Sequence, residues 1–262
     1  MKLIVLAKKN IASKNICNLL LKNYPNLQNN IFEINADVLE LDKFESEFSK
    51  LNPELIIVAS SHKSESGTPM LSAHFTGNWT LNDLGGEKEK LSIAPALYLR
   101  EAVLKLYEQQ QKLNLSEYLV GMEVTHHSPT FNFPVIFIEV GSTEENWQDK
   151  TACLGAAETI NHIMINKPEK TDIAIGIGGG HYAQTFNRKI FQKKKIAFGH
   201  IIPKYQIEKV KEKLILEAFK KTIPKPDFAV IDWKGCGKSK YREQIINVLN
   251  KNNIRWIKDK EL

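Results

Sequence analysis

Four histidines of this sequence fall where they could act together. His62, the adjacent pair His126 and His127, and His181 each follow a short apolar run that predicts a β-strand. Open α/β sheets bind their ligands beyond the carboxyl ends of the strands, so we expect these imidazoles to converge there, with Asp232 after a further strand. Imidazole is the commonest neutral metal ligand. Three or more such groups around an open position indicate a catalytic metal site.

The stretch Asp172–Ala183 shows how one of these histidines is presented. Its apolar residues lead into three consecutive glycines, which are followed by His181. Glycine adopts positive φ without strain and lets other groups approach the backbone closely. We therefore expect a sharp turn that sets His181 at the end of a buried strand. The spacing GxGGGH matches neither the dinucleotide fingerprint nor the phosphate-binding loop.

The chemistry expected of such a site is hydrolysis. A bound metal lowers the pKa of its water to near neutrality, which provides hydroxide for attack on an acyl carbon. No HExxH or CxxC motif is present, so the spacing identifies no metal. Serine catalysis is an alternative because Ser61 and Ser128 each lie beside a histidine, although the GxSxG elbow is absent. The alternative for each histidine taken singly is a structural role, as a hydrogen-bonded residue that binds no metal.

The elements that must position these residues alternate along the chain. Strands are expected at Lys2–Ala7, Asn30–Asn35, Leu55–Ser60, Leu119–Thr125, Pro134–Val140, the start of Asp172–Ala183, Ile196–Ile202, Asp227–Ile231 and Arg255–Ile257. Helices are expected from Ser13, as a cap, to about Lys22, and at Asp42–Leu51, Ala94–Lys112, Glu144–Ile165, Tyr205–Thr222 and within Gly237–Asn250. The predicted fold is α/β, a mixed and largely parallel central sheet with helices on both faces, in a single domain over residues 1–262.

The segment Lys63–Ser92 has neither helical nor strand periodicity. It carries several glycines, a proline, His74 and Trp79. A structureless segment of about thirty residues in a compact domain is uncommon and is usually functional. We expect a long functional loop.

Glu139 is a further carboxylate, but a simple geometric argument excludes it. If Leu119–Thr125 and Pro134–Val140 form a hairpin, Glu139 lies roughly 17 Å from His126 and His127, at ~3.3 Å per residue. It is therefore not expected at the site.

The charge balance is basic. The chain has 36 Lys and Arg residues against 30 Asp and Glu, a formal charge of +6 and a pI near 9.0. This favours a polyanionic partner such as nucleic acid, although a compositional bias of the source genome is an alternative. Lys234 and Lys238 lead from a strand into a helix N-terminus, where they form a phosphate contact or a solvated face. A basic loop is expected over 188–195.

Other features exclude some classes of protein. The three cysteines are odd in number and widely spaced, which predicts neither a disulfide framework nor a thiolate zinc site. No apolar run approaches the ~20 residues that a transmembrane helix needs. Lys8 and Lys9 interrupt the N-terminal apolar run, which argues against a signal peptide. We expect a cytoplasmic protein without membrane association.

Five sequence blocks, in order, resemble the archaeal and plant type of D-aminoacyl-tRNA deacylase. They are SSHKSESGTPMLSAHFTGNW, MEVTHHSPT, PVIFIEVGSTEENW, GIGGGHYA and GHIIPKY. The resemblance extends over essentially the whole chain. It implies a zinc-dependent esterase that removes D-amino acids from the 3′ end of tRNA, with a fold similar to peptidyl-tRNA hydrolase and phosphorylase-like folds. Gln184 stands where the family usually has proline, and Ser128 where glycine is common.

The resemblance also implies a set of functional residues. His62, His74, His126, His127 and His181 match the family's motifs. Motif matching leaves open which of them bind zinc and which act as acid or base. The assignment adopted here makes His62, His126 and His181 the metal ligands and His74 and His127 the catalytic groups.

Substrate binding is expected to involve the long loop and the basic face. Trp79 could receive the terminal adenosine by stacking, and Lys234 and Lys238 could contact phosphates. The tRNA is the expected partner, and no obligate protein partner is implied. Two alternatives remain: a metallohydrolase acting on peptidyl-tRNA or a nucleoside-like small molecule, and a non-catalytic tRNA-binding protein.

Overall fold

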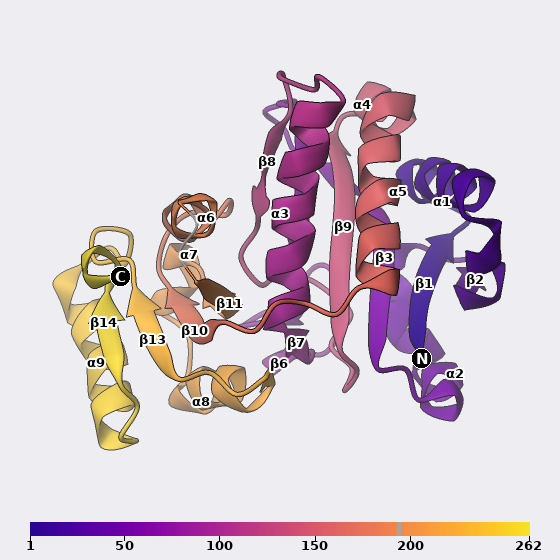
Figure 1. The fold of residues 1–262 in the computed structure, drawn as a ribbon. Helices are drawn as coiled ribbons and strands as arrows, with labels where there is room; N and C mark the ends of the chain where they lie inside the picture. Colours follow the sequence, from indigo (N-terminus) through magenta and orange to yellow (C-terminus); the bar gives the residue numbers. More distant parts are fainter. Residues whose placement is uncertain (193–194) are drawn as a thin grey trace.

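The computed structural model describes residues 1–192 and 195–262, and within them the strands form two larger sheets (Figure 1). The first has the order β2-β1-β3-β9-β4-β8, with β2 (Ile31–Ile34), β1 (Lys2–Ala7), β3 (Leu55–Lys63), β9 (Val135–Ser142), β4 (Met70–His74) and β8 (Leu119–Met122). The second has the order β11-β10-β13-β14, with β11 (Ile196–Ile202), β10 (Asp172–Ile177), β13 (Phe228–Ile231) and β14 (Trp256–Lys258). Neighbours in both sheets are parallel except β4 and β9. The predicted mixed, largely parallel α/β fold is confirmed, although its strands divide between two sheets.

Two short two-stranded sheets are formed outside the larger sheets. They are β5 (Gly77–Asn78) with β6 (Lys90–Leu91), antiparallel, and β7 (Ala94–Pro95) with β12 (Thr222–Ile223), parallel. The α-helices are α1 (Ile11–Asn23), α2 (Glu45–Leu51), α3 (Ala96–Lys112), α4 (Glu144–Gln148), α5 (Lys150–Ile165), α6 (Gln184–Phe191), α7 (Lys204–Ile207), α8 (Glu212–Lys220) and α9 (Ser239–Lys251). Short 3₁₀ helices span Pro25–Asn30, Val38–Phe44 and Asp259–Glu261.

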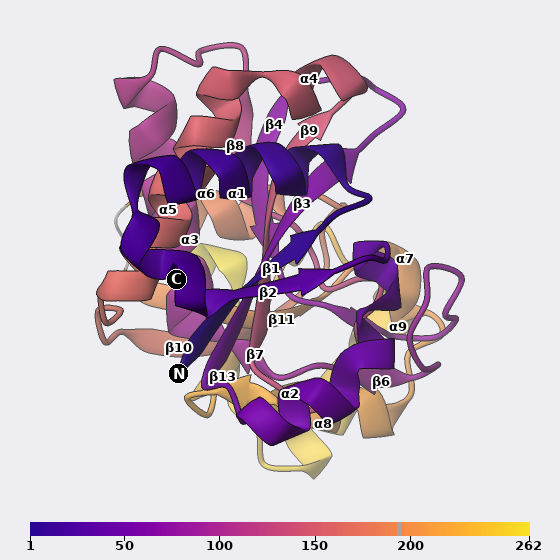
Figure 2. The same ribbon diagram turned by 90° about the vertical axis from the view of Figure 1, so that its right-hand side faces the viewer.

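Alternation along the strands separates two apolar layers, because successive side chains point to opposite faces. Ile57 and Ala59 of β3 pack into the layer formed with α1, α3 and α5. Ile56 and Val58 pack into the opposite layer, toward α2 and Phe131. Figure 2 shows α1 and α2 on opposite sides of these strands. Helix α3 also contacts β11, so it joins the two sheets. The single-domain organisation stays a prediction.

The expected loop over Lys63–Ser92 contains a central strand. Residues Met70–His74 form β4, which lies between β9 and β8. The hairpin of the β8 and β9 segments that was assumed for Glu139 does not form, because β4 separates the two strands. Strand β9 instead runs parallel to β3, so both strands end at the same edge.

Two predicted helices are interrupted. Glu144–Ile165 divides at Asp149, whose carboxylate accepts backbone N–H groups of Thr151 and Ala152 and so begins a second helix. Tyr205–Thr222 divides into α7 and α8. The cap of α1 is Asn10 rather than Ser13: the Asn10 side chain accepts the Ser13 N–H at 2.9 Å.

The expected basic loop over 188–195 begins as helix. Arg188 and Lys189 belong to α6, whereas Lys193 and Lys194 lie outside the described residues. In the described part of the chain, no helix has the length and apolar character that crossing a bilayer requires.

The close pairing of β3 and β9 depends on a glycine. Gly141 lies opposite His62, and a Cβ at Gly141 would stand 2.4 Å from the His62 carbonyl oxygen and 2.6 Å from its Cβ. No flexible side chain could move aside, because one of these atoms is backbone. The register that presents His62 therefore requires glycine at this position.

We predict that Gly141→Ala lowers the free energy of unfolding by about 1–3 kcal/mol, the usual effect of overpacking. The matched control is Gly155→Ala in helix α5, where the new Cβ would meet side chains at 3.5 Å or more. That control should be neutral or stabilising because alanine favours the helix. Urea denaturation of both variants measures the effect, and equal stability of the two would contradict the proposed close contact.

Candidate metal centre

Strand register brings three polar side chains to one face of the first sheet. Ser60 of β3 pairs with Glu139 of β9, and Phe137 of β9 pairs with His74 of β4. Because side chains alternate, His62, Glu139 and His74 share the face that carries the α2 layer. That layer is apolar up to Phe137 and becomes polar at the strand ends. The exclusion of Glu139 by the hairpin argument is thus wrong.

The segment Glu123–His127, directly after β8, connects the two sheets. Its first three backbone N–H groups donate to carbonyl oxygens of different elements: Ala73 of β4 at 3.0 Å, His181 after β10 at 2.9 Å, and Ile201 of β11 at 3.3 Å. The segment is therefore fixed at the junction of the sheets. It delivers Glu123, His126 and His127 to the face that carries Glu139.

The glycine-rich turn after β10 places His181. Gly178 and Gly179 have φ of +102° and +84°, as predicted for this turn, and a Cβ at Gly178 would stand 2.8 Å from Cys236 Sγ. Asp232 does not join the histidines as expected. Its carboxylate accepts hydrogen bonds from Thr185 Oγ1 and the Gly235 N–H, both at 2.8 Å, and so stabilises the neighbouring turn.

Two buried carboxylates connect the histidines. Glu123 lies 2.7 Å from His181 Nε2, 3.2 Å from His62 Nδ1 and 3.8 Å from His126 Nε2. Glu139 Oε2 lies 3.6 Å from His62 Nδ1 and 3.7 Å from the buried His74 Nε2. The result is one continuous cluster. His62 stands between both carboxylates, and its Nε2 faces the Tyr182 hydroxyl at 3.4 Å.

The carboxylates and two histidines compensate one another's charge. Burial disfavours the charged form of His62, but Glu123 and Glu139 outweigh burial and raise its pKa to about 11. The same balance raises the pKa of His74. Burial alone would raise the pKa of Glu139, yet His62 and His74 lower it to about 2. Glu123 behaves alike: His181 and His62 hold its pKa well below the usual range.

The remaining imidazoles are kept neutral. Burial and the neighbouring His74 charge lower the pKa of His127 to about 4 and that of His126 well below its ordinary value. Their Nδ1 atoms donate to backbone carbonyls, His126 to Val124 at 2.8 Å and His127 to Ser128. Each therefore presents Nε2 as a lone pair.

The Nδ1 of His74 likewise faces a backbone carbonyl, the Phe75 oxygen at 3.1 Å. Its Nε2, and Oε1 of Glu123, are fully buried and make no hydrogen bond to any described residue. Buried polar atoms without a partner are rare, and a cation or water between them is the ordinary explanation.

Within the described residues, three groups of side chains place their donor atoms close enough to hold a metal ion. These groups are His74 with His126 and His127; Glu123 with His126 and His181; and His62 with Glu123 and Glu139. In each group the donor atoms lie within 4.8 Å of one another. The expected ligand set of His62, His126 and His181 is not one of these groups. Its members are spread over two groups that share Glu123.

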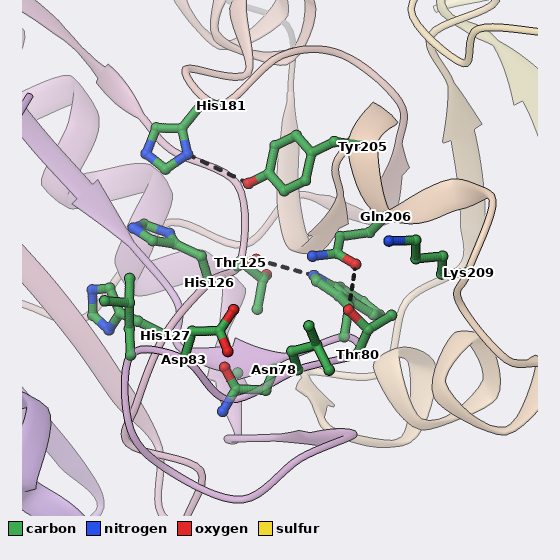
Figure 3. A pocket seen from close by; sticks show the side chains of 14 residues that line it. Asn78, Thr80, Asp83, Thr125, His126, His127, His181, Tyr205, Gln206 and Lys209 are labelled. Carbon is green, nitrogen blue, oxygen red and sulfur yellow. Dashed lines mark hydrogen bonds between the residues drawn. The ribbon is translucent and has the colours of Figure 1, made fainter. Parts of the chain in front are cut away.

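Two cavities open on the cluster. The Tyr205 cavity, of about 380 Å³, is lined by Trp79, Thr80, Asp83, Tyr205, Gln206 and Lys209 among others (Figure 3). The Ser61 cavity, of about 560 Å³, is lined by Asn10, Val38, Leu39, Ser61, Lys63 and Ser64 among others. His126, His127, His181 and Leu84 line both. The histidines therefore stand where the two cavities meet.

The residues expected to bind substrate lie in different positions. Trp79 lines the Tyr205 cavity but is only 2% exposed, and its indole N–H donates to the Thr125 carbonyl at 3.0 Å. Its ring is part of the wall, without a free face for stacking. Lys234 and Lys238 are exposed and, as the structure describes them, line neither cavity. Their contact with phosphate stays a prediction.

Comparison with known proteins decides the family. Residues 49–257 match the family described as D-aminoacyl-tRNA deacylase. The D-aminoacyl-tRNA deacylase of Thermococcus onnurineus is 34% identical over 99% of this chain and 100% of its own length, and that of Methanocaldococcus jannaschii is 31% identical over 97% and 98%.

This chain belongs to the D-aminoacyl-tRNA deacylase family. A crystal structure described as a conserved protein of unknown function has the same fold. It superposes with a TM-score of 0.88 at 26% identity, over 100% of this chain and 96% of that one.

The structure of this deacylase-family protein brings together all five histidines singled out in the sequence. It adds two carboxylates: Glu123, which was missed in the sequence, and Glu139, which the hairpin argument excluded. Glu123 and Glu139 each interrupt an otherwise apolar strand segment. A carboxylate in such a position must find a cationic partner when it is buried. That interruption was the available signal.

The two remaining histidines have other roles. His200 is fully buried in the wall behind the cluster, where its Nε2 donates to the Ser92 carbonyl at 3.0 Å and its Nδ1 accepts from the Thr125 hydroxyl at 3.1 Å. Burial lowers its pKa to about 3. His162 lies on α5, partly exposed, away from the site.

His200 predicts a loss of stability in acid. The unfolded chain takes up a proton at this residue below about pH 6.5, whereas the folded chain resists uptake down to about pH 3, so stability falls between these values by about 1.4 kcal/mol per pH unit. We expect His200→Gln to flatten this part of the curve, measured by denaturant unfolding at successive pH values. His162→Gln is the control and should leave the curve unchanged. An unaltered slope in the His200 variant would refute this origin.

Proposed function

We propose that this protein hydrolyses the ester bond of D-aminoacyl-tRNA to free tRNA and D-amino acid, as a chiral proofreading enzyme of the cytoplasm with zinc as cofactor. The observation that carries the proposal is the histidine–carboxylate cluster at the meeting point of two cavities, in which His74 Nε2 and Glu123 Oε1 have ion-pair contacts but make no hydrogen bond to a described residue. The names of the family and its relatives support the choice of substrate.

The donor set fits zinc. His74, His126 and His127 form one of the possible metal-holding groups, and the Nδ1 of each is engaged with a backbone carbonyl. Zinc-bound histidines commonly have this second hydrogen bond, which fixes the ring and leaves Nε2 for the metal. We therefore assign His74, His126 and His127 as ligands. When bound, zinc supplies a water acidic enough to react near neutral pH and a positive charge for the developing oxyanion.

His62 and His181 then take the roles first given to His74 and His127. His181 Nε2 donates to Glu123 at 2.7 Å, which fixes the tautomer and leaves Nδ1 as the basic atom. Nδ1 accepts a weak contact from the Tyr205 hydroxyl at 3.5 Å. His181 lines both cavities, so Nδ1 can accept a proton from the attacking water and return it to the departing ribose oxygen.

His62 positions this machinery. Its imidazolium stands between Glu123 and Glu139 and keeps both ionised. Glu123 is then a carboxylate able to orient His181. The Trp147 indole N–H donates to the His62 carbonyl at 2.8 Å and holds the end of β3 in place.

The activity is tested by following D-tyrosyl-tRNA and L-tyrosyl-tRNA side by side, each with and without a chelator. We expect loss of the D-ester alone, abolished by the chelator and restored by zinc. Equal hydrolysis of both esters would contradict proofreading, and hydrolysis that survives complete metal removal would contradict the cofactor.

The division of roles predicts two classes of variant. His74→Ala and His127→Ala should weaken zinc binding by more than the ~10–100-fold that loss of an outer partner produces. His181→Ala should retain zinc yet lose about 10²–10⁴-fold in kcat, the usual contribution of a general acid–base group. Zinc is measured by competition with a chromophoric chelator, and His162→Ala is the surface control. Zinc loss in the His181 variant with retention in the other two would reverse the assignment.

A further inference from the structure

The two cavities meet at His126, His127, His181 and Leu84. An ester attacked beside these histidines has a ribose on one side of the reacting carbon and an amino acid on the other. The ribose and the amino acid must therefore extend in different directions from the residues where the cavities meet. We propose that the Tyr205 cavity holds the terminal nucleotide and the Ser61 cavity holds the amino acid. This assignment rests on the proposed function.

Tyr205 gives the first reason. Its side chain is 53% exposed while its hydroxyl lies 3.5 Å from His181 Nδ1, so the ring is held beside the reacting position with a face open. Figure 3 shows this ring next to His181 on the wall of the cavity. Bases of single-stranded nucleic acid stack on such rings. Buried Trp79 completes the wall behind, so Tyr205 takes the stacking role that the sequence suggested for Trp79.

The charges of the same cavity give the second reason. Lys209 lies across the cavity from the histidines, where a phosphate of the terminal nucleotides would pass (Figure 3). Outside the cavity lining, Lys204 lies near the exposed Lys238, because a Cβ at Gly237 would lie 3.4 Å from the Lys204 Cε. Asp83 also lines the cavity and offers an acceptor for the exocyclic amino group of adenine.

The Ser61 cavity has a different character. As the structure describes its lining, it contains no Phe, Tyr or Trp. Beside the cluster itself, its walls combine serines, Val38 and Leu39 with the charged residues Asp37, Lys63 and Glu65. It is the larger of the two, at about 560 Å³ against about 380 Å³. Such a cavity accepts side chains of different size and offers no platform for a base.

The divide between the cavities is fixed. Leu84 is 54% exposed, but its carbonyl accepts the Ser128 N–H at 3.3 Å, and Asn78 donates to the next carbonyl, that of Gly85, at 2.8 Å. These bonds fix the backbone of Leu84, whose side chain lines both cavities and so lies between the nucleotide and the aminoacyl group. A substrate must present its ester beside Leu84.

The first test measures binding of the trinucleotide CCA, the 3′ end of tRNA, by fluorescence titration. Tyr205→Ala should weaken CCA binding about 5- to 150-fold, the range that loss of one base–aromatic stack produces. Tyr205→Phe keeps the ring and should stay within about twofold of the natural protein. Leu39→Trp, in the other cavity, should likewise leave CCA affinity unchanged. Absence of CCA binding to the natural protein, or loss of it in Leu39→Trp but not in Tyr205→Ala, would overturn the assignment.

The second test measures kcat/KM for D-tyrosyl-tRNA and D-alanyl-tRNA. Leu39→Trp narrows the Ser61 cavity, so it should reduce the kcat/KM for D-tyrosyl-tRNA relative to that for D-alanyl-tRNA by about tenfold or more. Leu39→Ala should not reduce this ratio. Tyr205→Ala should lower both values equally. A changed ratio in Tyr205→Ala with an unchanged one in Leu39→Trp would reverse the two cavities.

The two tests separate this inference from the proposed function. A protein that binds CCA through Tyr205 but hydrolyses no D-aminoacyl-tRNA contradicts the proposed activity and leaves the nucleotide cavity standing. A protein that hydrolyses D-aminoacyl-tRNA with CCA binding independent of Tyr205 overturns only the cavity assignment.

Discussion

The burial of Glu123 and Glu139 in one layer is the constraint on which the rest of the site depends. An ionised carboxylate taken out of water is destabilising by several kcal/mol unless it is paired and hydrogen-bonded. Here each carboxylate is surrounded by imidazoles, and His62 is shared between them. The cluster is thus stable only as a balanced set of charges, and a divalent cation bound at His74 can take over the part played by the proton of that residue.

The fold builds this balance from two sheets. The first supplies His62, His74 and Glu139 from strands β3, β4 and β9, and the second supplies His181 from the turn after β10. The segment Glu123–His127 is hydrogen-bonded to both sheets, so the relative placement of the two is encoded in the site itself. A cavity on each side of this junction then gives an ester two directions in which to extend. A hydrolase whose substrate joins two different groups needs its catalytic residues at the junction of two cavities, as they are here.

The sequence allowed a substantial part of this to be predicted. Apolar runs that end in His62, His126 and His181 indicated parallel strands, and the structure confirms that these three histidines converge. The reason differs from the predicted one, because these strands belong to two sheets joined by a connecting segment. Glycine spacing correctly predicted the turn before His181, since positive φ is a local property of the chain.

Other features depend on long-range pairing and could not be read locally. The segment Met70–His74 has weak strand character of its own, yet its backbone pairs with β9 and β8 on both sides, and this makes it a central strand. Missing it led to the wrong hairpin and so to the exclusion of Glu139. Glu123 was overlooked because its partners come from β3 and from the turn after β10, distant in sequence.

The division of the cluster into ligands and proton-transfer groups is the central claim, and a crystal of the zinc-loaded protein tests it most directly. Anomalous diffraction recorded on both sides of the zinc absorption edge locates the metal without assumptions about its ligands. We predict a single strong peak coordinated by His74, His126 and His127, with His181 hydrogen-bonded to Glu123 and free of the metal. A peak between His62, Glu123 and Glu139, or no peak in the cluster, would contradict it.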